Sequence, residues 1–282
     1  MFQLTPLEPV DYLIVGHISH DRLLEGSRLG GTVAYAGLTA EALGLRVGVV
    51  TSWAADLPLG PLSSIPIISY PSDFSTTFEI RETNNGRKLK ILHVAHKLDY
   101  FQIPEPWRRA SVVHLAPIAQ EVEPSLVRNF TSALVGVTPQ GWLRAWGGDG
   151  GVYLGEWPEA PFVLQRIGAA VISVEDVGGD ENRIEEMAAH CRVLAVTEAG
   201  DGVRVYWNGD VRRFRPPMVN VVDTTGAGDI FAAAFFARLY MTRDPLEAGR
   251  FATQLATISV TRAGFTSIPS PEEIKACLQE VY

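Results

Sequence analysis

The chain has 282 residues, of which 46% are hydrophobic and 20% charged. This composition is typical of a soluble globular protein and excludes extensive disorder. The formal net charge of -8 argues against a general nucleic-acid-binding protein, whose affinity depends on clustered cations. It does not exclude an anionic ligand, because backbone N–H groups bind phosphate without net positive charge.

Cysteine content and the N-terminal sequence bear on the cellular compartment. Cys191 and Cys277 are too few for a disulfide framework or a Cys-rich zinc site, which indicates reduced thiols. Residues 1–19 contain no basic segment and do not predict a signal peptide. No stretch approaches the length of a membrane span. We therefore expect a cytoplasmic protein that binds neither membranes nor nucleic acid and is a monomer or a homodimer.

The chain opens with a strand–helix–strand unit, which is typical of a parallel sheet. A strand at 12–15 precedes an Ala-rich helix at about 32–43, a capping Gly44 and a strand at 46–52. Further strands are predicted at 112–116, 134–139, 169–174, 192–200 and 203–207, and helices at 181–190, 229–240, 245–263 and 271–281. We therefore predict one doubly wound, mostly parallel α/β domain over residues 1–282.

A second pattern interrupts this alternation between about residues 65 and 97. Apolar and polar residues alternate there around Asn84-Asn85-Gly86, which predicts antiparallel strands and a hairpin turn. We expect these strands, with a second insertion at about 17–30, to form a small β-sheet lid.

The most informative segment begins at Val219. A β-branched run at 219–222 predicts a strand that ends in Asp223, and a tight turn of small residues follows from Thr224 to Gly228. Asp229 then opens an apolar helix. Backbone N–H groups in such a turn converge, and the helix dipole adds partial positive charge. This arrangement suits the developing negative charge of a transferring phosphoryl group.

Asp229 lies at the mouth of this turn, where a general base would accept the proton of an attacking hydroxyl. The alternative is that Asp229 only caps the helix, which is common for Asp at helix starts. The chain has no G-x-x-x-x-G-K-[ST] and no G-x-G-x-x-G, so neither a P-loop nor a Rossmann dinucleotide site is predicted.

The string DTTGAGD followed by an Ala- and Phe-rich helix resembles the C-terminal signature of the PfkB (ribokinase-like) family of sugar kinases. Other segments resemble the family in the same order along nearly the whole chain. They are the first strand followed by GHISHD, the di-glycine Gly30-Gly31, the lid strand STTFEI at 75–80, and ATISVTRAGFTSIPS at 256–270.

The resemblance implies catalysis by Asp229 as the base, with Gly226, Ala227 and Gly228 as the anion hole for the γ-phosphoryl group. It implies that Asp21, Gly30 and Gly31 hold the substrate hydroxyls, with Tyr35 at the position of a sugar-contacting Asn. Gln140 follows a predicted strand, where α/β ligand sites gather, and either reaches the substrate or caps the next turn.

The resemblance also implies ATP, Mg²⁺ and a monovalent cation such as K⁺. ATP would contact Thr197, Gly200, Gly202 and Thr225 together with Gly226 and Gly228. Asp176 would order Mg²⁺ through water, and Asp223, Thr225, Ser259, Arg262 and Gly264 would surround the monovalent cation.

Three positions depart from the family pattern. Ala199 replaces the first glycine of T-x-G-x-x-G, which it can do at negative φ; otherwise the loop must shift. The N-x-x-E motif is Ser173-Val174-Glu175-Asp176, so that a shorter carboxylate, Asp176, occupies the Glu position. Tyr35 alters substrate recognition and argues against a ribokinase.

The sequence thus predicts an ATP-dependent kinase for a sugar, a polyol or a nucleoside. The segments Gly30–Gly37 and Gln140–Arg144 are most similar to members that act on inositol-like polyols. A catalytically silent nucleotide- or sugar-binding regulator on the same fold is the alternative, and the intact Gly226–Asp229 segment argues against it.

Overall fold

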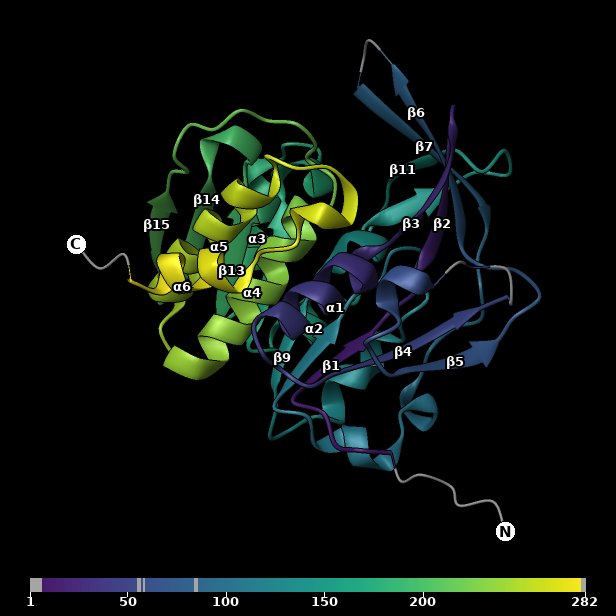
Figure 1. The fold of residues 1–282 in the computed structure, drawn as a ribbon, viewed down its shortest axis with the longest axis horizontal. Coiled ribbons are helices and arrows are strands. Elements are labelled where there is room, and N and C mark those ends of the chain that lie inside the picture. The colour runs from purple at the N-terminus through teal and green to yellow at the C-terminus, as the bar shows by residue number, and fades with distance from the viewer. Residues whose placement is uncertain (1–6, 55–56, 58, 84–85, 280–282) are drawn as a thin grey trace.

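A nine-stranded sheet forms the centre of the molecule (Figure 1). The computed structural model describes residues 7–54, 57, 59–83 and 86–279. The strand order is β15-β14-β13-β12-β9-β8-β1-β4-β5. The parallel strands are β1 (Tyr12–Val15), β4 (Val47–Trp53), β5 (Ile67–Pro71), β8 (Val112–Leu115), β9 (Leu134–Val137), β12 (Ala169–Ser173) and β13 (Val193–Thr197). Antiparallel β14 (Val203–Trp207) and β15 (Asp210–Phe214) extend the sheet beyond β13.

Both faces of this sheet are covered, because successive residues of a strand point to opposite faces. Tyr12 and Ile14 of β1 join the core on the side of helices α1 (Thr32–Ala42), α4 (Ala227–Thr242), α5 (Pro245–Ser259) and α6 (Pro271–Gln279). Leu13 and Val15 join a second core with α2 (Ala160–Leu164) and α3 (Glu181–His190). Burial on both faces explains why the parallel strands are almost continuously apolar.

Helix α4 is apolar around its whole circumference, and its residues from Ile230 to Ala237 are buried. The Phe236 ring lies against Gly136 of β9 and meets His114 of β8 edge-on, with ring centroids 4.9 Å apart. The helix begins directly after Gly226, whose φ of 79° is readily adopted only by glycine. The position of this N-terminus therefore follows from the packing of the whole helix.

The lid is a separate four-stranded sheet of order β3-β2-β6-β7. Its strands are β2 (Ser19–Leu23), β3 (Gly26–Gly30), β6 (Thr77–Thr83) and β7 (Gly86–His93). Phe78, Ile80 and Ile91 form a small core with Ile118 and Ala119. A further pair, β10 (Arg144–Trp146) and β11 (Val152–Leu154), lies beside β7. Asn84 and Asn85 of the predicted hairpin turn lie outside the described residues.

Three sequence predictions were wrong in detail. Residues 67–71 do not belong to the lid, because they pair in parallel with β4 at the edge of the main sheet. Residues 219–222 form no strand; Val222 N donates to the Val260 carbonyl, and Val219 and Val221 border a cavity instead of a neighbouring strand. The helix predicted over 245–263 ends at Ser259. The sequence analysis also missed β10, β11, β15 and α2.

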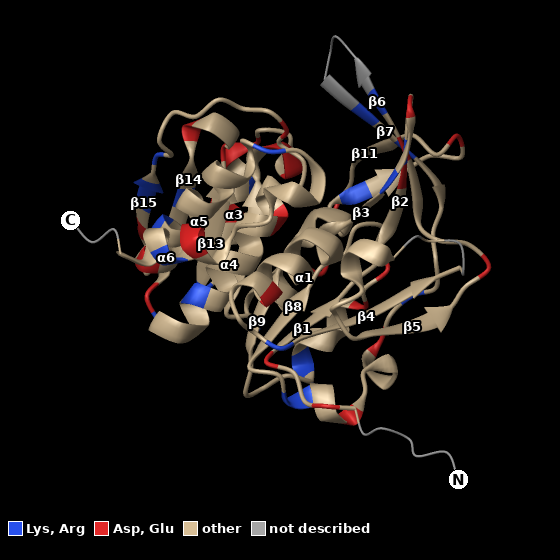
Figure 2. Cartoon of the chain, in the orientation of Figure 1, with Lys and Arg blue, Asp and Glu red and all other residues tan. Residues whose placement is uncertain are grey.

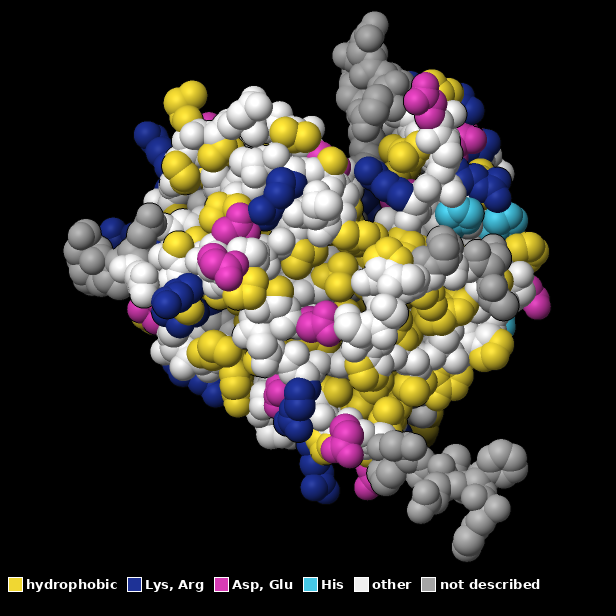
Figure 3. All heavy atoms as spheres, in the orientation of Figure 1, with side chains coloured by type: hydrophobic (Ala, Val, Ile, Leu, Met, Phe, Trp, Pro, Cys, Tyr) yellow, Lys and Arg dark blue, Asp and Glu magenta, His cyan; other side chains and the backbone are white. Residues whose placement is uncertain are grey.

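Short 3₁₀ turns connect several elements, at Gly60–Leu62, Tyr100–Gln102, Glu105–Arg109, Pro124–Arg128, Pro139–Gly141, Val174–Val177, Ala199–Asp201 and Gly264–Ser267. Charged residues lie mainly on the helices and loops, while the central strands carry few (Figure 2). On the face shown in Figure 3, apolar side chains gather around α1, β4 and β5. Among the described helices, none is long and apolar enough to span a bilayer.

The contact between Gly136 and Phe236 yields a test of the packing beneath α4. A Cβ at position 136 would lie 2.7 Å from the ring carbons of Phe236. We expect Gly136→Ala to lower the free energy of unfolding by about 1–3 kcal/mol, the usual cost of overpacking. The matched control is Gly148→Ala, whose Cβ meets nothing within 4 Å and which should change it by less than about 0.5 kcal/mol. Equal urea midpoints for the two variants would contradict tight packing here.

Candidate active site

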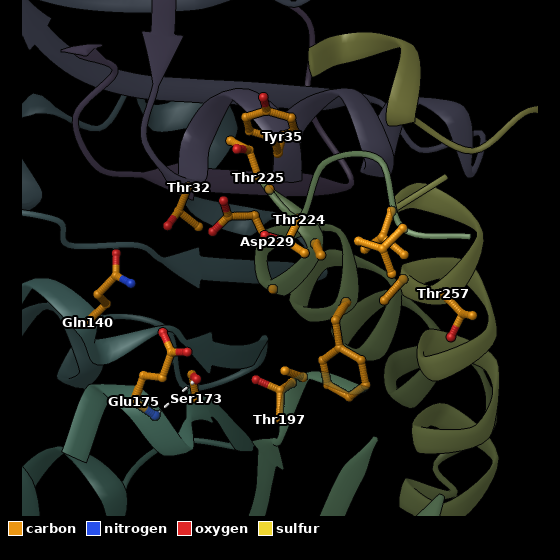
Figure 4. A pocket seen from close by; sticks show the side chains of 18 of the residues that line it. Thr32, Tyr35, Gln140, Ser173, Glu175, Thr197, Thr224, Thr225, Asp229 and Thr257 are labelled. Carbon is orange, nitrogen blue, oxygen red and sulfur yellow. Dashed lines mark hydrogen bonds between the residues drawn. The ribbon is translucent and has the colours of Figure 1, made fainter. Parts of the chain in front are cut away.

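A cavity of about 780 Å³ lies between the lid and the carboxyl ends of the main strands. Its walls come from the ends of β12 and β13, the lid strands, the start of α1, residues 216–229 and helix α5. In open α/β sheets, ligands bind beyond the carboxyl ends of the strands. Figure 4 shows Asp229 and Thr32 on one wall, Gln140 and Glu175 across from them, and Thr197 and Thr257 farther along.

The turn before α4 is held by the Asp223 carboxylate. Its Oδ1 accepts the Thr225 N–H at 2.9 Å, and its Oδ2 accepts the Gly264 N–H at 3.2 Å. Burial opposes ionisation of this group, but the hydrogen bonds from Thr225 and Gly264 outweigh it and lower the pKa. Asp223 is therefore a stable anion that ties the turn to the segment after α5.

Two glycines of the turn have different surroundings. A Cβ at Gly226 would overlap the ring of Tyr35, whereas a Cβ at Gly228 would meet nothing within 4 Å. Gly226 is thus packed against the Tyr35 ring, while Gly228 faces open space in the cavity. The Ala227 N–H donates to the Thr224 carbonyl at 3.2 Å, so this amide of the predicted anion hole already has an intramolecular partner.

Tyr35 lies directly beneath the turn. Its ring is buried, packs against Gly226 and contacts the ring of Phe265, with centroids 4.9 Å apart. It also borders the cavity. Tyr35 therefore supports the turn from the side of α1, a role that the sequence alone did not indicate.

Asp229 is the third residue of α4 and borders the cavity. Burial raises its pKa from 3.8 to about 6; a hydrogen bond from the Thr32 side chain opposes the rise, and the Asp176 carboxylate adds to it. Arg144 partly offsets the effect of the neighbouring carboxylates. A carboxylate with a pKa near 6 is ionised at neutral pH and has a higher proton affinity than an exposed Asp.

The lid end of the cavity brings together Asp21, Gly30, Gly31 and Gln140, all predicted to bind substrate. Asp21 is buried on β2, and its Oδ1 accepts the Ser19 hydroxyl at 2.7 Å. A Cβ at Gly30 would overlap the Asp21 carboxylate, so glycine there makes room for it. Gly31 has a φ of 86° and passes close to the His17 carbonyl.

Gln140 and Asp176 contact each other. Gln140 Nε2 donates to Asp176 Oδ1 at 3.2 Å, and the Ser173 N–H donates to Asp176 Oδ2 at 2.8 Å. Burial raises the pKa of Asp176. Glu175, which the sequence analysis did not select, borders the cavity, whereas Asp176 is not among the residues that line it. Both carboxylates suit Mg²⁺, which proteins usually hold through one or two carboxylates plus substrate phosphates and water.

The other end of the cavity is lined by the predicted nucleotide residues Thr197, Gly200 and Gly202. Apolar side chains lie beside them, from Pro216, Met218, Val221, Ala256 and Val260. Ala199 adopts a φ of 48°, so of the two alternatives the one with negative φ does not apply. The alanine takes the left-handed conformation favoured by glycine, at a cost of roughly 1–2 kcal/mol.

The residues predicted around a monovalent cation are only partly assembled. Asp223, Thr225 and Gly264 are hydrogen-bonded together. The Ser259 hydroxyl instead donates to the Ala256 carbonyl, and the Arg262 guanidinium pairs with Glu273 at 2.8 Å. In the described part of the chain, no three His, Cys, Asp or Glu residues cluster as a metal site. The cation site therefore stays a prediction that rests on backbone groups.

The structure adds residues that sequence reasoning missed. Arg144 borders the cavity and donates to the Ile118 carbonyl at 3.0 Å. Glu121 is fully buried and accepts the N–H groups of His17 (3.0 Å) and Ala119 (2.7 Å), which joins the loops after β1 and β8. Isolated charged residues in loops carry no local signal, so only their buried partners identify them.

Comparison with known proteins agrees with this geometry. Residues 165–273 match the family described as pfkB family carbohydrate kinase. Inositol 3-kinase of Oryza sativa subsp. japonica is 28% identical, over 97% of this chain and 74% of that protein. Cytidine kinase of Thermococcus kodakarensis is 28% identical, over 84% of this chain and 91% of that protein. The chain is a carbohydrate kinase that resembles the pfkB family.

A solved structure shares the fold of this kinase. It is a pyrophosphate-dependent kinase in the ribokinase family, complexed with a pyrophosphate analog and myo-inositol. The TM-score is 0.78 at 17% sequence identity, over 94% of this chain and 99% of that chain. The mostly parallel sheet with a β lid is therefore confirmed as a ribokinase-like fold.

The open space at Gly228 yields a test of the turn. A Cβ there would meet no protein atom within 4 Å, so a valine would extend into the cavity from this point. We expect Gly228→Val to lower kcat by at least about tenfold while the thermal midpoint changes little, because the side chain would crowd a bound phosphate. ADP release and thermal unfolding measure the two effects. Full activity would exclude the turn from phosphate binding, and a Gly148→Val variant controls for the substitution itself.

Proposed function

We propose that this kinase transfers the γ-phosphoryl group of ATP to a hydroxyl of a cyclic polyol or a sugar, with Asp229 as the general base. The observation that carries the proposal is the position of Asp229. It lies on the first turn of α4, beside the open face of Gly228 and in the same cavity as Asp21. A hydroxyl held between these groups would be near both a base and an anion-binding turn.

The acceptor end supports a neutral, hydroxyl-rich substrate. Asp21, Ser19, Gln140 and Asp229 line it, and carboxylate and amide oxygens accept hydrogen bonds from hydroxyls. Three carboxylates in this region, Asp21, Asp176 and Asp229, disfavour an anionic acceptor. Apolar lid residues Phe78, Ile80 and Leu89 cover the same end and would keep water from the donor phosphate.

The donor end supports a nucleotide over pyrophosphate. Met218, Val221, Ala256 and Val260 give it an apolar wall that a base would cover and a bare pyrophosphate would leave in water. Mg²⁺, when bound through Asp176 or Glu175 and the donor phosphates, would neutralise charge on the transferring group. The chain itself would supply the amide of Gly228, the α4 dipole and the base.

Two names among the relatives define the acceptors to test, since one is an inositol 3-kinase and another a cytidine kinase. We expect ADP release from ATP with myo-inositol or a related cyclic polyol, and much less with cytidine, ribose or fructose. Pyrophosphate should not replace ATP. Turnover with pyrophosphate alone would overturn the donor assignment. A protein that binds ATP and polyol but phosphorylates none of them would favour the silent regulator.

The raised pKa of Asp229 predicts a specific pH dependence of catalysis. The base acts only when ionised, so kcat/KM should fall about tenfold per pH unit below about pH 6, where Asp229 becomes protonated. Asp229→Asn should lower kcat by about 10²–10⁴-fold and leave ATP binding nearly unchanged. A variant that keeps more than about a third of the wild-type kcat would reduce Asp229 to a helix cap.

The substitution Asp229→Asn lowers activity but should increase the stability of the fold at neutral pH. Between pH 3.8 and about 6 the folded state binds more protons than the unfolded state at this group, so its contribution to stability falls as pH rises. At pH 7.5, Asp229→Asn should therefore raise the free energy of unfolding, by up to about 3 kcal/mol for a shift of about two pKa units. Below about pH 4 the gain should vanish, which urea titrations at both pH values would test.

Asp21 gives a separate test of the acceptor end. Its buried carboxylate would accept hydroxyl hydrogen bonds worth roughly 1.5–3 kcal/mol. We expect Asp21→Ala to raise KM for the acceptor by about tenfold or more and to change KM for ATP by less than about twofold. An unchanged acceptor KM in a folded variant would remove Asp21 from the acceptor site.

A further inference from the structure

Arg28 joins the lid to the turn from Thr224 to Gly228, which would bind the donor phosphates and is called the phosphate turn below. It belongs to lid strand β3, and its Nη2 donates to the Thr225 Oγ1 at 3.2 Å. The two residues are 197 positions apart in the chain. Thr225 lies in the turn immediately before Gly226, where its own N–H is held by Asp223. A side chain of the lid thus contacts the segment that would bind the donor phosphates.

The same lid hairpin carries the predicted acceptor carboxylate. In the antiparallel ladder of β2 and β3, Asp21 lies directly opposite Arg28. Side chains of directly opposed residues project from the same face of a sheet. A rigid unit of two strands therefore presents Asp21 to the acceptor end and Arg28 to the phosphate turn.

The surroundings of the guanidinium show that it acts on the turn electrostatically as well. Arg28 contributes to the lowered pKa of Asp223 and opposes the rise in the pKa of Tyr35, so its charge lies near both groups. Its Nε is buried and makes no hydrogen bond within the described residues. In the planar guanidinium, Nη2 is therefore held by Thr225, whereas the neighbouring Nε has no hydrogen-bond partner among the described residues.

We propose that Arg28 is a positioning residue that couples the lid to the phosphate turn. An acceptor bound at the lid then favours the arrangement of the turn that binds the donor, and a bound donor favours the arrangement of the lid that binds the acceptor. The proposal rests on the function proposed above. An acceptor held by Asp21 fixes the hairpin, the hairpin fixes Arg28, and Arg28 restrains Thr225 next to the anion-binding amides. By thermodynamic linkage, a donor on the turn must restrain the hairpin to the same degree.

This reciprocity permits a test that needs no acceptor. Hydrogen exchange of residues 19–30 is measured with and without saturating AMP-PNP and Mg²⁺, whose binding is verified by calorimetry. We expect donor binding to slow exchange in the hairpin of the wild-type protein by about fivefold or more, the lower end of typical coupling. In Arg28→Gln, AMP-PNP should still bind, but the slowing should be lost. Arg28→Lys should retain part of it.

Arg22 supplies the matched control, because it lies exposed on the neighbouring strand β2 of the same hairpin. Arg22→Gln removes the same charge and should keep the donor-induced slowing. A merely structural role of Arg28 would speed exchange of the free hairpin equally with and without AMP-PNP, leaving their ratio unchanged. That result, or wild-type slowing below twofold, would overturn the proposal.

Steady-state kinetics give a second readout once an acceptor is known. In the wild type, saturating acceptor should lower KM for ATP, and in Arg28→Gln this effect should disappear. Failure of the proposed function is recognised separately, since it would appear as absent AMP-PNP binding or absent phosphoryl transfer in the wild-type protein. If AMP-PNP binding and phosphoryl transfer are retained and only the coupling is absent, the result contradicts the role of Arg28 and not the proposed function.

Discussion

The burial of helix α4 is the constraint on which the rest of the site depends. Its residues from Ile230 to Ala237 are buried on every side, so packing against β8, β9 and α5 fixes the position of the helix. The N-terminus is then fixed as well, with Gly228 and Asp229 bordering the cavity. The Tyr35 ring, which packs against Gly226, supports this end of the helix.

Two carboxylates of this segment show how environment separates roles within seven residues of chain. Asp223 accepts backbone N–H groups at both oxygens, and its pKa is lowered. Burial raises the pKa of Asp229 to about 6, because the hydrogen bond from the Thr32 side chain opposes the rise only in part and the Asp176 carboxylate adds to it. The first therefore maintains structure at any physiological pH, whereas the second can exchange a proton. The difference follows from burial and hydrogen bonding and not from the residue type.

Much of the fold, and the turn from Thr224 to Gly228 before α4, could be predicted from the sequence, because both depend on local patterns. The parallel strands appeared as apolar runs, and the order of small residues before α4 determined the turn. The errors arose where one sequence pattern can have two physical causes. Val219 and Val221 border a cavity and do not belong to a strand, and the alternation at 67–71 reflects the edge of the main sheet. Arg28 and Arg144 were beyond prediction, since their partners are distant in the chain.

Strand β1 also determines when the chain can fold. It pairs with β4 on one side and with β8, about a hundred residues later, on the other. One of the cores that bury it contains α4 and α5, which follow residue 226. During synthesis, the N-terminal half would leave the ribosome with an unpaired, apolar strand edge and an uncovered sheet face. The core that joins β1 to α4 and α5 can therefore be completed only after the residues that follow 226 have been synthesised.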